Sequence, residues 1–233
     1  ETEAEEILWD DLKKRIDFLF ITAYGSFAED GTLQGFCEVL GIPYLGSKVL
    51  ASAIRIDKIA QKIFLQRAGI TVPPFIALTP PEVQTLSDYK QLTDRLSTSG
   101  VTGPYVVKPH KAGSSLGVSI VYDLEKLIPA IQTAGTIDQY RPQSVLIEQK
   151  IEGMEFSCII LTDLETGMPF ALPPTEIVHE EGTDLHDYTQ KYMPGRALKF
   201  TPPRLEDRLI KKIQHTGLET FTALGFINMA RID

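Results

Sequence analysis

The sequence predicts an α/β fold, because short apolar runs rich in β-branched residues alternate with segments of helical periodicity. Residues 17–23, DFLFITA, are apolar enough for a strand that is buried on both faces. Residues 104–121, PYVVKPHKAGSSLGVSIV, contain two β-type runs on either side of a loop of small residues. With 233 residues and 43% hydrophobic content, the chain is long enough for one or two such domains.

Charge and hydropathy exclude several classes of protein. The formal net charge is −8, whereas a general nucleic-acid binder would carry a basic face. No apolar run approaches the ~20 residues of a membrane span, and the acidic N-terminus does not resemble a signal peptide. Cys37 and Cys158 lie in apolar surroundings and are too few for a disulfide framework, so we expect two small buried side chains and a cytoplasmic location.

The remaining elements follow from periodicity and from their boundary residues. Gly41 and Gly69 end two helices, and Ser47 is a candidate cap between them. A long polar segment, 179–195, has no clear period and is typical of a lid. The predicted helices cover residues 5–15, 33–40, 49–68, 82–99, 123–134 and 205–224, and the further extended segments cover 144–148, 156–161, 170–178 and 227–233.

The hairpin at 104–121 is the strongest candidate for a binding site. Gly113, Ser114 and Ser115 let backbone N–H groups approach an anion closely, and the two hydroxyls can add donors. Lys108, on the preceding strand, can reach the same phosphate as a point charge. The alternative is an ordinary hairpin with a serine-rich turn.

Acidic residues stand at two further strand ends. Glu29 and Asp30 follow the 17–23 segment, where they could bind a cation or an amine, or where Asp30 could cap the next helix. Glu148 and Glu155 flank a short connector between strands, where a carboxylate can accept hydrogen bonds from ribose hydroxyls or an amine. The alternative for each glutamate is a solvent-facing side chain.

Three other charged residues have two interpretations each. Lys58 lies inside the predicted 49–68 helix, and its spacing alone indicates only a solvated lysine. Arg231 and Asp233 project to one face of the last strand. Such a pair is either a plain ion pair or the arrangement that holds an oxyanion and a metal side by side.

Seven segments, in order, resemble the D-alanine–D-alanine ligases, a family of ATP-grasp enzymes. From about residue 17 to the end, the matching segments are YGSFAEDGTLQG, GIPYLGSKVLASA with a later DK, VVKPHKAGSSLGVS, LIEQKIEGMEF, LPPTEIV, DYTQKY and ALGFINMARID.

This resemblance implies an ATP-grasp fold with two α+β halves and a partial N-terminal Rossmann-like α/β domain. The implied divisions are 1–47 for the rest of the N-terminal domain, 48–147 for the central half and 148–233 for a truncated C-terminal half. The implied reaction joins two D-alanines through an acyl phosphate, using ATP and Mg²⁺ or Mn²⁺, for peptidoglycan synthesis. The implied assembly is a homodimer.

The resemblance also implies which residues bind the nucleotide. Lys58 and Lys108 match the family's two phosphate-contacting lysines. Glu148 matches the acid near the adenine amino group, and Glu155 matches the ribose acid. Ile151 would offer backbone groups to the adenine ring.

The implied catalytic residues come from three other segments. Ser114 matches the loop serine over the phosphates and the substrate. Lys191 and Tyr192 match lid residues that close on substrate and phosphate, which fits the need to keep water from an acyl phosphate. Arg231 matches the arginine that stabilises the tetrahedral oxyanion, and Asp233 matches the first magnesium ligand.

Some positions depart from the family pattern. Tyr24 replaces a histidine near the first substrate, Ala28 replaces a glycine, and Ala112 replaces a frequent glutamate. The lid segment 188–192 reads YTQKY where the family has tyrosine, glutamate, alanine, lysine and tyrosine. Nothing before Asp17 matches the family's first strand, and the remaining magnesium ligands would follow Asp233, so we expect a truncated chain.

These departures motivate other hypotheses. One is an ATP-grasp ligase for other amino acids or another acceptor, which Tyr24 and Ala112 suggest. A second is a nucleotide-binding domain without turnover, which the missing metal ligands suggest. A weaker third is a kinase-like or carboxylase-like grasp enzyme with a non-amino-acid acceptor.

Overall fold

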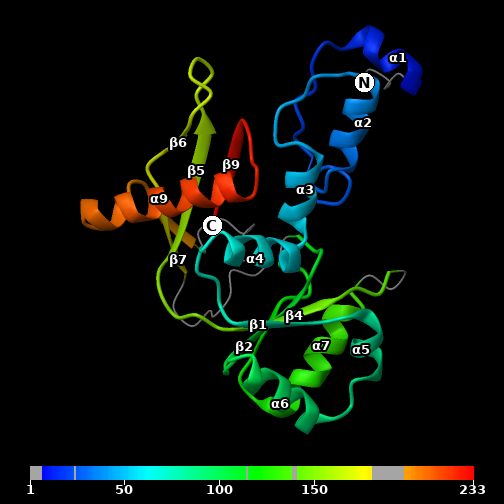
Figure 1. The fold of residues 1–233 in the computed structure, drawn as a ribbon, viewed down its shortest axis with the longest axis vertical. Coiled ribbons are helices and arrows are strands. Elements are labelled where there is room, and N and C mark those ends of the chain that lie inside the picture. The colour runs from blue at the N-terminus through cyan, green and yellow to red at the C-terminus, as the bar shows by residue number, and fades with distance from the viewer. Residues whose placement is uncertain (1–6, 24, 114, 138–140, 180–196) are drawn as a thin grey trace.

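The computed structural model describes residues 7–23, 25–113, 115–137, 141–179 and 197–233. Strands in these ranges form two antiparallel sheets, and a shorter N-terminal helical part extends away from them (Figure 1). The connector between the fourth and fifth strands is the direct covalent link from one sheet to the other.

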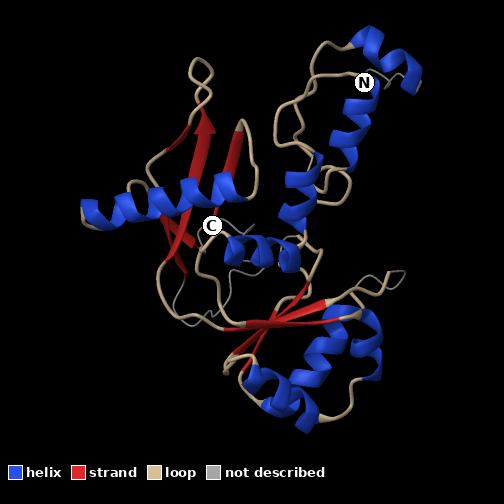
Figure 2. Cartoon of the chain, viewed as in Figure 1, coloured by secondary structure: helices blue, strands red, loops and turns tan. Residues whose placement is uncertain are grey.

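The first sheet has four strands in the described residues, in the order β1-β4-β2-β3. Its helices cover one face, where apolar side chains from strands and helices form a closed core (Figure 2). The strands are β1 (Phe75–Leu78), β2 (Tyr105–Pro109), β3 (Ser119–Val121) and β4 (Val145–Gln149), and the helices are α5 (Pro80–Thr85), α6 (Tyr89–Thr98) and α7 (Leu127–Gly135), the last preceded by a 3₁₀ turn, Leu124–Lys126.

The second sheet is built around β5 (Glu155–Thr162). In the described part of the chain, β5 pairs with β6 (Pro169–Ala171), β7 (Thr175–His179) and β9 (Met229–Ile232), and β7 pairs with β8 (Ala197–Phe200). Helix α9 (Asp207–Ala223) packs against β5, β6 and β9 (Figure 1). Cys158 is buried in this core, and Cys37 is buried in an N-terminal helix, so the expectation of two buried free cysteines is confirmed.

The N-terminal part contains α1 (Trp9–Arg15), α2 (Thr32–Leu40), α3 (Val49–Ile56) and α4 (Lys58–Arg67). The expectation of a strand buried on both faces at 17–23 is wrong. Leu19 makes one isolated bridge to Tyr44, while Phe18 is 52% and Phe20 is 62% exposed. An apolar run forms a buried strand only where neighbouring strands supply both ladders, and among the described residues only this bridge pairs with it.

Two helices that we expected to be continuous are each broken at an aspartate. The 49–68 helix divides at Asp57 into α3 and α4, and the 82–99 helix divides into α5 and α6 ahead of Asp88. Asp57 has extended φ and ψ, and its side chain accepts a hydrogen bond from Ala60 N. Asp88 accepts bonds from two backbone N–H groups at the start of α6. Aspartate is a favoured N-cap because its carboxylate satisfies such N–H groups.

Ser47 also differs from its expected role. The N-cap of α3 is Lys48, and Ser47 Oγ instead accepts a hydrogen bond from Ile227 N at 3.2 Å. This bond ties the start of α3 to the segment before β9, on the second sheet. Gly41 ends α2 in the left-handed conformation, as the sequence indicated.

Candidate active site

The face of the first sheet opposite α5, α6 and α7 carries two charged side chains from adjacent strands. Val107 and Ile147 lie in the helix-covered core, so the alternation of side chains places Lys108 of β2 and Glu148 of β4 on the opposite face. Lys108 lies directly opposite Leu146, and Glu148 is therefore its diagonal neighbour. Their side chains meet: Lys108 Nζ donates to Glu148 Oε1.

Helix α4 lies over this same face and adds a second lysine to the carboxylate (Figure 1). Lys62 Nζ is 2.6 Å from Glu148 Oε2 and 5.5 Å from the centre of the Phe75 ring on β1. The Glu148 side chain is only 6% exposed and that of Lys62 is 12% exposed. Burial alone would raise the pKa of Glu148, but the ammonium groups of Lys108 and Lys62 hold this pKa below its usual value.

Lys58 begins α4 one turn before Lys62 and contacts the glycine-rich hairpin. Its Nζ donates to the carbonyl oxygen of Ala112 at 2.6 Å, and its backbone N–H donates to His110 O at 3.0 Å. Lys108 belongs to the strand that leads into this hairpin. The structure therefore brings Lys58 and Lys108 to one hairpin, whereas the alternative of a solvated Lys58 is wrong. Two lysines, Lys62 and Lys108, on the single carboxylate of Glu148 leave a surplus of positive charge beside the hairpin, which suits an anionic ligand.

The hairpin loop closes on its own backbone bonds. Leu116 N donates to Gly113 O at 3.0 Å, and Val118 N donates to Ser115 O at 3.2 Å. A Cβ on Gly113 would meet nothing within 4 Å, so this part of the loop faces open space. Gly117 has φ +69°, and a Cβ there would lie 2.6 Å from Ile137 Cδ1. Gly117 is thus required by the fold, whereas Gly113 leaves room for a ligand.

Glu155 and Ile151 lie on the link between the two sheets. Glu155 is the first residue of β5 and pairs with Ile177, and Ile151 is 60% exposed on the preceding connector. The sequence places them within a few residues of Glu148, so all three residues lie in or next to the connector between β4 and β5. Their nucleotide-binding roles stay predictions.

Arg231 and Asp233 lie in and just after β9 of the second sheet. Arg231 Nε is 3.3 Å from Asp233 Oδ1, and the side chains are 67% and 50% exposed. The ion pair that the sequence allowed is present, and both groups remain accessible. Within the described residues, no three His, Cys, Asp or Glu side chains gather as a metal site. One carboxylate suits Mg²⁺ where phosphate oxygens and water complete the shell.

The acids at the start of α2 serve the fold. Asp30 accepts hydrogen bonds from the backbone N–H groups of Phe27 and Thr32 at 2.8 and 2.9 Å. Glu29 accepts from Gly25 N and pairs with Arg55 Nη2 at 2.6 Å. The N-cap of α2 is Gly31 rather than Asp30, so Asp30 binds the N–H of the first helical residue from the turn before the cap. A ligand role for these acids gains no support from the geometry.

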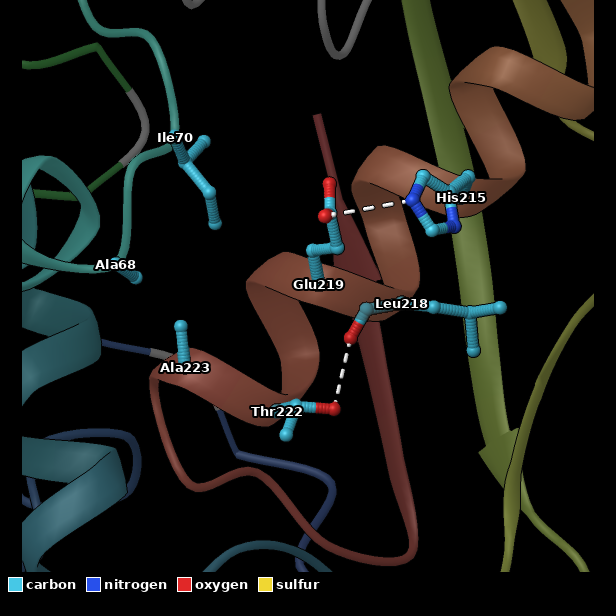
Figure 3. A pocket seen from close by; sticks show the side chains of 7 residues that line it. All are labelled: Ala68, Ile70, His215, Leu218, Glu219, Thr222 and Ala223. Atoms are coloured by element: carbon cyan, nitrogen blue, oxygen red, sulfur yellow. Dashed lines mark hydrogen bonds and ion pairs between the residues drawn. The ribbon is translucent and has the colours of Figure 1, made fainter.

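Three predicted catalytic residues, Ser114, Lys191 and Tyr192, lie outside the described residues, as do Tyr24 and the 188–192 segment. A separate pocket of about 400 Å³ lies between the end of α4 and α9 (Figure 3). It is lined by Ala68, Ile70, His215, Leu218, Glu219, Thr222 and Ala223, and none of these is a predicted site residue.

Sequence reasoning missed Lys62. A lysine inside a helix ordinarily has its ammonium in water, and nothing in the local pattern marks this one as buried. The available signal was its spacing, because Lys62 lies four residues after Lys58 and therefore on the same face of α4. From this spacing, a site that contains Lys58 is expected to lie near Lys62 as well.

Comparison with known proteins gives the family. The model of the D-Ala–D-Ala ligase C-terminus matches residues 64–233, and that of the N-terminus matches residues 1–47. The chain belongs to the D-alanine–D-alanine ligase family. It is 38% identical to the D-alanine–D-alanine ligase of Desulforamulus reducens over 94% of its own length and 66% of the relative's. It is 36% identical to that of Carboxydothermus hydrogenoformans, with 95% and 67% covered.

Solved structures of this family have the same fold. The VanG D-Ala:D-Ser ligase from Enterococcus faecalis superposes with a TM-score of 0.76 at 30% identity, covering 93% of this chain and 58% of that one. The D-alanine–D-alanine ligase from Bacillus anthracis gives 0.74 at 34% identity, covering 96% and 67%, and its complex with ATP gives 0.72. The expected ATP-grasp fold is thereby confirmed. The chain spans less than two thirds of several of these relatives. In the described residues, no helix combines the length and apolar composition needed to cross a bilayer.

Proposed function

We propose that the protein containing this chain is an ATP-dependent ligase that joins two D-alanines. The observation that carries this proposal is the pairing of Lys62 and Lys108 with Glu148, on the strands next to a glycine-rich hairpin that Lys58 contacts. A surplus of positive charge beside a loop with open space above Gly113 is what a triphosphate needs. Family membership supplies the substrate class, and the Bacillus anthracis relative has been solved with ATP.

The reaction has two steps that balance. A carboxylate oxygen of the first D-alanine attacks the γ-phosphorus of ATP, which forms an acyl phosphate and releases ADP. The amine of the second D-alanine then attacks the acyl carbon, and inorganic phosphate leaves with formation of the peptide bond. Phosphoryl transfer depends mainly on positioning and charge neutralisation, which the lysines provide.

Residues of both sheets would serve these steps. Lys58 and Lys108 would hold the phosphates under the loop of Gly113, Ser114 and Ser115, and Glu148, Ile151 and Glu155 would hold the adenosine. Asp233 would be one ligand of Mg²⁺, which when bound neutralises charge on the transferring phosphoryl group. Arg231 would stabilise the tetrahedral oxyanion, and Lys191 and Tyr192 would close over the intermediate.

The test uses the protein expressed in full from its gene. We expect ADP and phosphate release that requires Mg²⁺ and D-alanine, with D-alanyl-D-alanine identified by mass spectrometry. Turnover with other D- or L-amino acids, but not with D-alanine, would replace the proposal by the alternative ligase. ATP binding without product from any pair would replace it by a nucleotide-binding domain.

D-Serine is a second candidate for the amino acid that attacks the acyl phosphate. The VanG D-Ala:D-Ser ligase is among the similar structures, so D-serine belongs in the panel of second substrates. Mixed dipeptide formed in preference to D-alanyl-D-alanine would identify a ligase of that kind.

Three wider features are part of the proposal. We infer a cytoplasmic location, because ATP and a peptidoglycan precursor pathway are found there, and a homodimer, as the family resemblance implies. We also infer division at residues 47 and 147. A division near residue 147 is supported by the confinement of the first sheet to residues 75–149 and of the second to residues 155–232 in the described ranges, with β4 continuing two residues past 147. Light scattering would measure the assembly, and limited proteolysis would locate the divisions.

A further inference from the structure

Glu148 has one ammonium group on each carboxylate oxygen, and the two lysines differ in burial. Lys62 Nζ contacts Oε2 with a side chain that is 12% exposed, whereas Lys108 contacts Oε1 with a side chain that is 28% exposed. Lys62 Nζ also lies over the Phe75 ring, so its ammonium group lies between α4 and β1. Lys108 is the partner with more access to the open side of the site.

The two lysines would separate when a nucleotide binds. The proposed function requires Lys108 to contact a phosphate, and its single ammonium group would then leave Glu148 Oε1. A carboxylate that is only 6% exposed is costly to keep ionised without a cationic partner. Lys62 is the charged group that stays, because it contacts the other oxygen, Oε2, and has the less exposed side chain of the two lysines.

We propose that Lys62 is a positioning residue for adenine selectivity. It keeps Glu148 ionised, so that Oε1 can release Lys108 and accept a hydrogen bond from the adenine 6-amino group instead. This inference rests on the proposed function. An ionised carboxylate only accepts hydrogen bonds, so it favours an N–H donor and repels a carbonyl oxygen at the same position. Lowering of the Glu148 pKa by both lysines agrees with an acceptor-only group at neutral pH.

The test compares two nucleotides that differ at this position and at the neighbouring N1. Inosine triphosphate carries a carbonyl oxygen where ATP carries the 6-amino group, and its N1 carries a proton that adenine lacks. We expect Lys62→Met to weaken ATP binding by about tenfold or more while inosine triphosphate binding changes little, so the ATP preference falls. In turnover, the KM for ATP should rise and kcat should change little, because this contact is equal in ground and transition states. Lys62→Arg should restore the preference.

A matched control removes the same charge from the same helix. Arg67 lies exposed in the last turn of α4, and Arg67→Met should leave the ATP preference unchanged. An Arg67→Met variant that lost the preference as much as Lys62→Met would overturn the inference, because a general loss of charge on α4 would then explain both.

A double-mutant cycle keeps the inference testable if Lys62→Met alone does not fold. Glu148→Gln removes the charge that Lys62 neutralises, so the double variant buries no uncompensated carboxylate. Glu148→Gln should lower the ATP preference, and adding Lys62→Met should lower it no further. A further loss in the double variant would show that Lys62 acts apart from Glu148 and would overturn the inference.

The proposed function and the inference about Lys62 are contradicted by different results. If the unsubstituted protein binds neither nucleotide, the proposed function fails and the inference fails with it. If the unsubstituted protein prefers ATP and Lys62→Met keeps that preference, the inference alone is overturned. Equal weakening of both nucleotides by Lys62→Met would assign Lys62 a purely structural or phosphate-contacting role and would also overturn it.

Discussion

Substitution of Lys108 by methionine tests the phosphate site most directly. Methionine keeps an unbranched stem of similar length and removes only the ammonium group, so packing against β4 is largely retained. The variant removes one of the two cations on Glu148, and Lys62 Nζ remains 2.6 Å from Oε2. The fold should therefore persist, and the effect should appear in ligand binding.

The magnitude follows from the contact that ATP must replace. A hydrogen bond to a charged group contributes about 1.5–3 kcal/mol, which corresponds to about 10- to 150-fold in affinity. In the structure Lys108 is already paired with Glu148, so phosphate binding exchanges one charged contact for another. We therefore expect a loss near the lower end, about tenfold in the dissociation constant for ATP.

Calorimetric titration with ATP and with adenosine at one ionic strength separates the phosphate contact from the base contact. Lys108→Met should weaken the binding of ATP by about tenfold. It should not weaken the binding of adenosine, because adenosine has no phosphate and Glu148 Oε1 is freed. Lys90→Met on α6 is the control, since Lys90 is exposed on a helix that covers the other face of the sheet. Equal weakening of ATP and adenosine, or no weakening of ATP, would refute the reasoning.

Three further predictions concern other parts of the chain. Arg231→Ala should lower kcat with little change in ATP affinity, because its proposed oxyanion exists only in the transition state; equal losses in both would indicate a structural pair with Asp233. Gly117→Ala should lower the melting temperature by several degrees, because φ +69° and the Ile137 contact both disfavour a Cβ; an unchanged melting curve would contradict this. Hydrogen bonds from the backbone and side chain of Thr79, together with Arg95, lower the pKa of Glu82 to about 2. Its stabilising effect is therefore present above pH 4.5 and lost as the pH falls toward 2, so Glu82→Gln should flatten the decline of stability in that range, and an equally steep decline would contradict the capping role.

The strands of both sheets could be predicted because their sequences leave few alternatives. Val106 and Val107 in β2, and Leu146 and Ile147 in β4, are β-branched or aliphatic runs that a charged residue follows, and all are buried. The 17–23 run has the same composition but lacks comparable pairing among the described residues. Composition therefore indicates that a segment can form a strand, whereas pairing with neighbouring strands decides whether it does.

The residues around Glu148 show what a sequence pattern leaves undetermined. Lys108 and Glu148 were identified from the strand pattern, and Lys58 only through the family resemblance. The contacts that Lys58 and Lys62 make depend on how α4 lies on the sheet. A buried lysine such as Lys62 is stable only because a carboxylate from another element meets it. Such a pairing is a property of the tertiary structure, so periodicity within α4 could not reveal it.

The break at Asp57, which the helical pattern concealed, is what directs α4 toward the hairpin. In a continuous helix, Lys58 N would donate to the carbonyl four residues earlier, whereas here it donates to His110 O at 3.0 Å. Asp57 stabilises the break from both sides, since it accepts from Ala60 N at 3.0 Å and lies 3.5 Å from Lys111 Nζ. The new helix therefore starts against the hairpin, and its first two turns place Lys58 on the hairpin and Lys62 on Glu148. The break at Asp57, which the helical pattern did not predict, therefore helps to form the proposed phosphate site.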